Sequence, residues 1–130
     1  MQPITFYYVN SWGIATNKDD MKKQIAAFGP IACGIQATKA FESYKSGIFS
    51  QTMPAGTTIN PDHEVSIVGW GTEKGTDYWI GRNSWGTMWG DMGYFKIKMG
   101  SDNLGIETEC TWGVPSYEPN MPKAETITVE

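Results

Sequence analysis

The 130-residue sequence contains one histidine and two cysteines, and its ten lysines and arginines form no cluster. Because phosphate binding needs a clustered basic face, the formal net charge of −4 argues against nucleic acid as a partner. No apolar run approaches the roughly 20 residues of a membrane span, and residues 1–10 lack the basic start and apolar middle of a signal peptide. We expect no nucleic-acid or membrane partner, and any export signal on sequence outside this stretch.

One histidine and two cysteines also make no zinc-binding spacing. Two cysteines are too few for the disulfide framework of a small secreted domain. They form either a single bridge or two buried free thiols that behave as small apolar residues. We therefore expect no metal ion and no cofactor.

The composition is that of a globular, turn-rich domain. Hydrophobic residues make up 40% of the chain, aromatic residues 13%, and glycine occupies 15 positions. The length suits one domain with a sizeable core. We expect one folded lobe over residues 1–115, followed by a loose polar tail over residues 116–130, where proline and glutamate recur.

A single helix is predicted at residues 18–28. Asn17 can cap its start, and Met21, Ile25 and Phe28 recur at helical spacing before a Gly-Pro pair ends it. Residues 38–44 are expected to form a short helical turn, and the proline-containing residues 50–61 a loop.

Strands are predicted where apolar and polar residues alternate with a period of two. Residues 104–111 are expected to be extended, and Trp70 and Trp79 to lie in the core. The glycine-rich residues 84–92 predict a loop with unusual backbone angles. Hairpin-connected strands with one good helix predict a β-dominated α+β fold, an antiparallel β-barrel-like lobe. The predicted strands are residues 5–14, 31–37, 63–70, 78–83 and 93–99.

His63 precedes Asn83 by twenty residues, and Asn83 belongs to the run DYWIGRNSWGTMWGDMGY at residues 77–94. A side-chain carbonyl oxygen can accept from one imidazole N–H, which orients the ring while the other nitrogen faces a nucleophile. These residues are two of the three members of a Cys-His-Asn triad. An isolated histidine is more often a satisfied core or surface residue, but the Asn-Ser-Trp-Gly context favours the catalytic interpretation.

The segments HEVSIVGWG (residues 63–71) and YWIGRNSWGTMWGDMGYFKI (residues 78–97) resemble the His and Asn segments of papain-like cysteine peptidases. GPIACGI (residues 29–35) and ECTWGVP (residues 109–115) resemble one branch of that family. The resemblance covers roughly residues 5–115 and implies the right-hand, C-terminal lobe of a two-lobed fold. It implies His63 as general acid and base, oriented by Asn83 through Nε2–H, with Nδ1 facing a cysteine of the other lobe.

The resemblance also implies substrate contacts. Trp85 would cover the hydrogen bond between the histidine and the asparagine and exclude water from it. Trp89 would form an apolar wall on the leaving-group side. Gly34, Asp62 and Glu64 would border the pocket for the second side chain from the cleavage site.

Members of that branch carry cysteines at both matching places, so the resemblance implies a Cys33–Cys110 bridge and a lysosomal or extracellular, oxidising compartment. The family's nucleophile segment, a cysteine at a helix N-terminus after an oxyanion-hole glutamine, has no counterpart in this sequence. The implied partners are a peptide or protein substrate and an N-terminal lobe that carries the catalytic cysteine. Gly81 departs from the family's usual valine or isoleucine, at a modest expected cost to its strand.

Two other classes of function stay open at this point. The chain could be a non-catalytic binding or inhibitory module that kept half a cleft without the nucleophile. A carbohydrate-binding β domain that uses exposed tryptophans is a more distant alternative. Glu42, Asp62 and Glu64 offer carboxylates for glycoside chemistry, but no surrounding motif supports that use.

Overall fold

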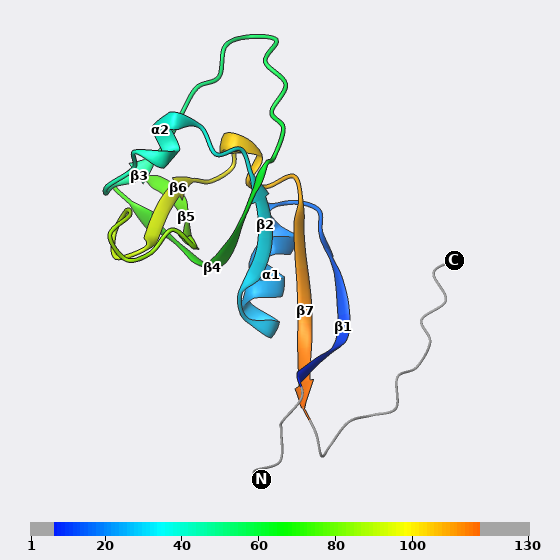
Figure 1. Ribbon diagram of the computed structural model, residues 1–130. Helices are drawn as coiled ribbons and strands as arrows, with labels where there is room; N and C mark the ends of the chain where they lie inside the picture. The colour runs from blue at the N-terminus through cyan, green and yellow to red at the C-terminus, as the bar shows by residue number, and fades with distance from the viewer. Residues whose placement is uncertain (1–6, 118–130) are drawn as a thin grey trace.

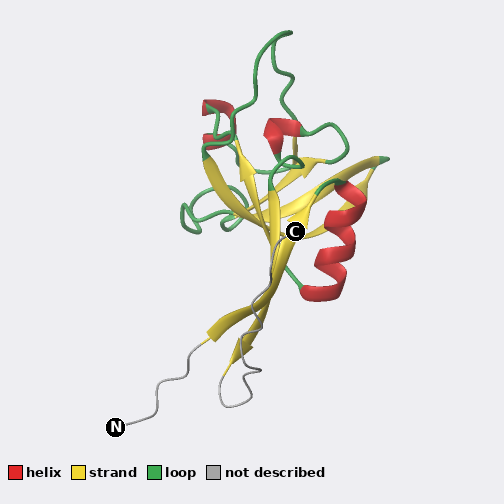
Figure 2. Cartoon of the chain, turned by 90° about the vertical axis from the view of Figure 1, so that its right-hand side faces the viewer, coloured by secondary structure: helices red, strands yellow, loops and turns green. Residues whose placement is uncertain are grey.

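A computed structural model describes residues 7–117, which form a strongly coiled sheet with one long helix packed against it (Figures 1 and 2). The strand order is β1-β7-β2-β4-β5-β6-β3, and every pairing is antiparallel except the one between β3 and β6. The predicted β-dominated α+β fold is confirmed, with the sheet left open because β1 and β3 stand at its two edges. The strands are β1 (Tyr7–Ala15), β2 (Ile31–Ile35), β3 (Ile48–Phe49), β4 (His63–Glu73), β5 (Thr76–Arg82), β6 (Tyr94–Lys98) and β7 (Cys110–Tyr117).

Helix α1 (Lys18–Phe28) occupies the predicted residues. The Asn17 side chain accepts from the backbone N–H groups of Asp19 and Asp20, and the N–H of Gly29 donates to the carbonyl of Ile25. These contacts satisfy backbone groups that a helix leaves unpaired at its ends. The two shorter helices are α2 (Lys39–Glu42) and η1 (Asn103–Gly105). None of the helices in the described part of the chain is long and apolar enough to span a membrane.

The two strand tryptophans that the sequence assigned to the core have different surroundings. Trp79 is fully buried, as predicted. Trp70 is 39% exposed, so its assignment to the core was wrong. It pairs with Trp79 midway along the β4–β5 hairpin, where the Trp79 ring and the ammonium group of Lys22 contact its ring but leave part of it in water.

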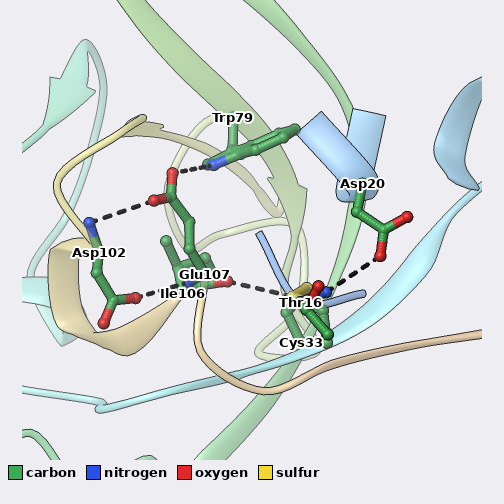
Figure 3. The surroundings of a disulfide bond; sticks show 8 residues. Thr16, Asp20, Cys33, Trp79, Asp102, Ile106 and Glu107 are labelled. Carbon is green, nitrogen blue, oxygen red and sulfur yellow. Dashed lines mark hydrogen bonds between the residues drawn. A yellow bond between two sulfur atoms is a disulfide. The ribbon is translucent and has the colours of Figure 1, made fainter. Parts of the chain in front are cut away.

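The segment before β7 is a tight turn, not the extended chain predicted for residues 104–111. Leu104 has a left-handed backbone with φ 55°, and η1 begins the turn. The Glu107 carboxylate accepts from Trp79 Nε1 at 2.8 Å and from the Asp102 N–H at 3.3 Å (Figure 3). It also accepts from the Gly100 N–H at 2.7 Å. The Glu107 N–H donates back to Asp102 Oδ1 at 2.9 Å. These side-chain bonds close the turn over Trp79, and local alternation could not predict them.

The disulfide between Cys33 and Cys110 is confirmed (Figure 3). The two residues face each other across β2 and β7, with Cα atoms 4.1 Å apart, slightly closer than the usual range of about 4.4–6.8 Å. Both side chains are fully buried. The bridge ties strands that share just two paired positions, Cys33 with Cys110 and Ala32 with Thr111.

The ends of the sheet differ slightly from expectation. Strand β7 includes Ser116 and Tyr117, which the sequence assigned to the tail, and these pair with Tyr8 and Tyr7 of β1. The rest of the predicted tail, residues 118–130, lies outside the described residues, as do residues 5 and 6 of the first predicted strand.

Gly81 faces the Phe95 ring across β5 and β6. A Cβ built on Gly81 would lie 2.1 Å from Phe95 Cζ, and the Phe95 ring is 1% exposed and packed edge-on against Phe41. The buried Phe95 ring therefore occupies the space that a side chain at residue 81 would need. This explains why residue 81 is glycine where the family usually has valine or isoleucine.

Replacing Gly81 by alanine is expected to lower the free energy of unfolding by roughly 1–3 kcal/mol, because the buried ring must move. Denaturant titration of the purified chain measures this. Gly69→Ala in β4 is the matched control, since its Cβ would have no neighbour closer than 4.0 Å. Equal unfolding midpoints for the two variants would contradict the proposed close contact.

Candidate active site

The hairpin of β4 and β5 brings His63 and Asn83 together. His63 begins β4, and Asn83 follows the last residue of β5. Because the strands are antiparallel and Ser66 pairs with Arg82, the start of one lies beside the end of the other. His63 Nε2 is 2.8 Å from Asn83 Oδ1, within hydrogen-bond reach as predicted.

A second donor determines the orientation of the Asn83 amide. The backbone N–H of Ser84 donates to Asn83 Oδ1 at 2.8 Å, so the atom at this position must be the oxygen. A carbonyl oxygen accepts and does not donate, so His63 Nε2 must carry the hydrogen. In the neutral imidazole, Nδ1 is then unprotonated and able to accept a proton. The sequence did not predict this contribution of the Ser84 backbone.

The loop after Asn83 has the unusual backbone angles that its glycines predicted. Gly86, Gly90 and Gly93 have φ values of 84°, 59° and 88°, and Met92 has 53°. The Asn83 N–H donates to the Gly93 carbonyl at 2.9 Å, so the two ends of the loop are joined behind the site. The glycines allow this closure because they adopt left-handed conformations without a Cβ clash.

Trp85 lies against the imidazole of His63, next to its hydrogen bond with Asn83. Its ring stacks on the imidazole with centroids 4.8 Å apart and planes 23° apart. Trp85 remains 38% exposed, whereas Asn83 is 8% exposed. Excluding water from this hydrogen bond strengthens it electrostatically.

Trp89 supports Trp85 from the core. It is 8% exposed, its Nε1–H donates to the carbonyl of Glu42 at 2.7 Å, and its ring meets Trp85 edge-on at 5.2 Å. The sequence predicted an apolar wall facing the substrate at this position. The ring is buried against Trp85 and Phe41, so Trp89 holds Trp85 and α2 in place, and its place on the leaving-group side stays a prediction.

A second predicted group of residues borders an open hollow of about 340 Å³ next to the imidazole. Gly34 of β2 pairs with Glu64 of β4, and the Gly34 N–H donates to the Glu109 carbonyl at 2.8 Å. We call this the acidic hollow, and its lining residues are Gly34, Pro61, Asp62, His63, Glu64 and Glu109.

Glu109 was missed at the sequence level. Its position follows from the disulfide, because Glu109 precedes Cys110 and Gly34 follows Cys33. A paired bridge between antiparallel strands brings these two neighbours together. The placement of Glu109 beside Gly34 could therefore have been predicted from the sequence once the Cys33–Cys110 pairing was assumed.

Burial raises the pKa of the Glu64 carboxyl above its ordinary value of 4.5, and repulsion from Glu109 adds to the rise, while His63 opposes it. An acid whose pKa rises on folding stabilises the folded state while protonated and loses that contribution as the pH rises through the folded value. Glu64→Gln is therefore expected to raise the free energy of unfolding at about pH 7, by at most about 1 kcal/mol at this exposure. Denaturant titration at about pH 4 should show a smaller gain. An equal gain at both pH values would contradict a charge effect.

Both cysteines of the chain are joined in the disulfide between β2 and β7. The chain therefore has no thiol to place against His63 Nδ1.

These features are those of the barrel-like lobe of a cysteine peptidase, and the chain belongs to the papain family of cysteine proteases. It matches the family described as "Papain family cysteine protease" over residues 4–114. It is 47% identical over 120 residues to a cathepsin Z of Onchocerca volvulus, covering 85% of this chain and 38% of that protein. The branch that residues 29–35 and 109–115 resemble is cathepsin X, also called cathepsin Z, in agreement with this match.

Solved structures show the same fold. The digestive procathepsin L 3 of the Tenebrio molitor larval midgut superposes with a TM-score of 0.73 at 28% identity, covering 82% of this chain and 35% of that one. The bromelain protease from Ananas comosus, in complex with the E64 inhibitor, gives 0.72 at 26% identity, covering 82% and 51%. The chain thus spans less than two fifths of the cathepsin Z that it matches and about half of the bromelain chain.

Proposed function

We propose that this chain supplies the histidine and asparagine of a Cys-His-Asn peptidase site of the cathepsin X type, completed by an N-terminal lobe that carries the cysteine. The observation that carries the proposal is the 2.8 Å hydrogen bond from His63 Nε2 to Asn83 Oδ1 beneath the Trp85 ring. It leaves Nδ1 unprotonated and facing away from the asparagine, as a base for a thiol must be.

In the proposed reaction, His63 Nδ1 takes the proton of the thiol, and the thiolate attacks the carbonyl carbon of the peptide bond. The imidazolium then gives this proton to the leaving amine, which departs and leaves an acyl-enzyme. Nδ1 next takes a proton from water, whose oxygen attacks the acyl carbon; the C–S bond then breaks, the acid is released, and the thiolate is left paired with the imidazolium, which can return the proton to it. Asn83 holds the ring through Nε2–H during each transfer.

Exposed apolar residues support the proposed partner lobe. Strand β1 exposes Val9 at 65%, Trp12 at 62% and Ile14 at 60%, and Trp85 is exposed beside His63. Large apolar side chains gathered on one element are typical of surfaces that another part of a protein covers. We expect the isolated chain to self-associate weakly, and the partner lobe to relieve this.

The proposed compartment is lysosomal or extracellular. The Cys33–Cys110 disulfide supports an oxidising environment, because such bridges are rare where thiols are kept reduced. The relatives named cathepsin agree with this proposal.

A non-catalytic binding module is the second candidate. It is favoured by the absence of any free thiol, since both cysteines of the chain are bridged. In that case the acidic hollow and Trp85 would bind a peptide without cleaving it.

Activity with and without the partner lobe separates the two candidates. The 130-residue chain is assayed on a fluorogenic dipeptide alone, and after refolding with a papain-family N-terminal lobe supplied in trans. We expect no hydrolysis by the chain alone, hydrolysis by the pair, and labelling of the lobe's cysteine by the epoxide E64. His63→Ala in the pair should lower the rate by roughly 10²–10⁴-fold or more.

Two outcomes would contradict the proposal. Enzyme-like hydrolysis by the chain alone, abolished by His63→Ala, would show that the site is complete without the lobe. A folded, stable pair that neither cleaves the dipeptide nor reacts with E64 would favour the binding module.

A further inference from the structure

We infer that Gly81 and Phe95 are positioning residues for His63. The Phe95 ring occupies the side-chain space of residue 81 and, through further aromatic rings, fixes the Trp85 ring against the imidazole. The inference rests on the proposed function, because it concerns the orientation of the histidine that this function uses.

The Phe95 ring lies directly on the backbone of Gly81. A Cβ built on Gly81 would have three nearest atoms that all belong to this ring, at 2.1, 2.4 and 2.7 Å. Gly81 is not among the glycines with a positive φ, so its backbone conformation would accept other residues. The ring alone requires a glycine here, and any side chain at residue 81 would push the ring away from β5.

Phe95 belongs to a set of four mutually packed rings that reaches the active site. We call this set the ring cluster, and its members are Phe41, Trp85, Trp89 and Phe95. The Phe95 ring meets Phe41 edge-on with centroids 5.0 Å apart, and it contacts Trp89 at 6.0 Å. Phe41 and Trp89 in turn contact Trp85, at 5.9 Å and 5.2 Å. Two routes of ring contact therefore lead from Phe95 to Trp85.

The ring cluster has little room to absorb a displacement. Phe41 and Phe95 are fully buried, and Trp89 is buried and anchored by the hydrogen bond from its Nε1–H to the Glu42 carbonyl. Protein interiors are packed about as densely as organic crystals, so a ring that moves displaces its neighbours. Trp85 is the partly exposed member of the cluster, and it can move into solvent. A displacement that begins at Phe95 is therefore expected to move Trp85.

Trp85 is also the ring that lies on the imidazole. The hydrogen bond from Nε2 to Asn83 holds one edge of the His63 ring, and Trp85 holds one face, with centroids 4.8 Å apart. A shift of Trp85 therefore changes the tilt of the imidazole and the direction of Nδ1. Misplacing a reacting group by about 1 Å can lower a rate roughly 10²-fold, so a smaller shift is enough to matter.

The test exchanges size between residues 81 and 95. Gly81→Val adds a side chain under the ring, Phe95→Leu removes the ring, and the double variant Gly81→Val/Phe95→Leu returns the total volume close to that of the parent. In ¹H NMR of the 130-residue chain, the ring C–H signals of His63 should lie upfield, because the face of the Trp85 ring shields them. We expect each single variant to move these signals, and the double variant to return them toward the parent positions.

The enzyme completed by the N-terminal lobe provides the kinetic readout. Gly81→Val should lower kcat roughly 10-fold and leave KM unchanged, because the change affects the orientation of His63 and not a substrate contact. The double variant should recover most of this loss.

Controls separate positioning from stability. Ile25→Val removes a buried methylene group from α1, outside the ring cluster, and should lower the unfolding midpoint without moving the His63 signals or kcat per folded enzyme. If Gly81→Val does not fold, Gly81→Ala replaces it and should move the signals in the same direction by less. Gly69→Ala is then the control, since its Cβ has no neighbour closer than 4.0 Å.

The outcomes keep this inference distinct from the proposed function. If the folded variants at residue 81 lose stability but leave the His63 signals at the parent positions, Gly81 only makes room in the core and the inference is wrong. The proposed function would still stand if His63→Ala abolished cleavage. A double variant whose signals lie no closer to the parent than those of the single variants would also overturn the inference. If the signals respond as expected and the completed enzyme cleaves nothing, the proposed function fails while the positioning of the imidazole stands.

Discussion

Replacing Asn83 by alanine is expected to lower kcat roughly 10²-fold in the enzyme completed by the N-terminal lobe, with little change in KM. Alanine removes the oxygen that holds His63 Nε2–H at 2.8 Å. The imidazole then rotates and exchanges tautomers under Trp85, so Nδ1 is correctly oriented for a smaller fraction of the time. Substrate binding does not use this bond, and the loss therefore falls on the chemical steps.

Asn103→Ala is the matched control. Asn103 is 7% exposed and Asn83 is 8% exposed, so the two truncations remove equally buried amides. Asn103 Oδ1 accepts from the Gln51 N–H, away from the histidine. Its loss should lower stability but leave kcat per folded enzyme and the pH–rate profile unchanged. Equal kcat for Asn83→Ala and the parent enzyme would refute the orienting role.

Asn83→Asp tests the role of the amide nitrogen separately from that of the amide oxygen. Asn83 Nδ2 is buried and, in the described part of the chain, has no hydrogen-bond partner. An ionised oxygen at that position would be buried without a compensating donor. We therefore expect Asn83→Asp to keep the bond to His63 but to destabilise the fold.

The imidazole ring itself provides a readout that needs no catalysis. In the chain alone, ¹⁵N NMR of His63 should show the Nε2–H tautomer, and Asn83→Ala should give a mixture of tautomers. A mixture in the parent chain would contradict the orientation that the Ser84 N–H imposes on the Asn83 amide.

Removing the disulfide is expected to lower the free energy of unfolding by about 4–5 kcal/mol, through the chain entropy of the opened loop. Cys33 and Cys110 are 77 positions apart, and β2 and β7 share few other pairings. Denaturant titration of the double variant Cys33→Ala/Cys110→Ala measures the change. Dithiothreitol should destabilise the parent chain and leave the variant unaffected.

Loss of the bridge should also disturb the acidic hollow, because the disulfide holds Glu109 beside Gly34. The amide signals of Gly34 and Glu109 should therefore shift more than those of α1. Mass spectrometry that found two free thiols in the unreduced chain would refute the bridge. An unchanged unfolding midpoint on reduction would refute its contribution to stability.

Sequence patterns correctly predicted those elements that are stabilised by contacts between residues close together in the chain. Helix α1 is capped at Asn17 and ends at Gly29, and each of these residues hydrogen-bonds with backbone groups only two to four positions away. The loop after Asn83 was predicted from its glycines for the same reason. The turn at residues 104–109 was not predicted, because it depends on Glu107 reaching back to Trp79 from 28 positions away.

The sequence by itself determined the class of fold, the helix, the pairing of β4 with β5 and hence the meeting of His63 and Asn83. The spacing of hydrophobic residues and the conformational preferences of turn residues depend only on residues close together in the chain. A hairpin pairs two consecutive strands and needs no contact with distant segments. Only the tertiary structure decided how far Trp70 is exposed, why Gly81 is a glycine, and that Trp89 supports the site from the core. Each of these depends on side chains that meet across neighbouring strands or between a loop and a helix, and their exposure is set by how those elements pack.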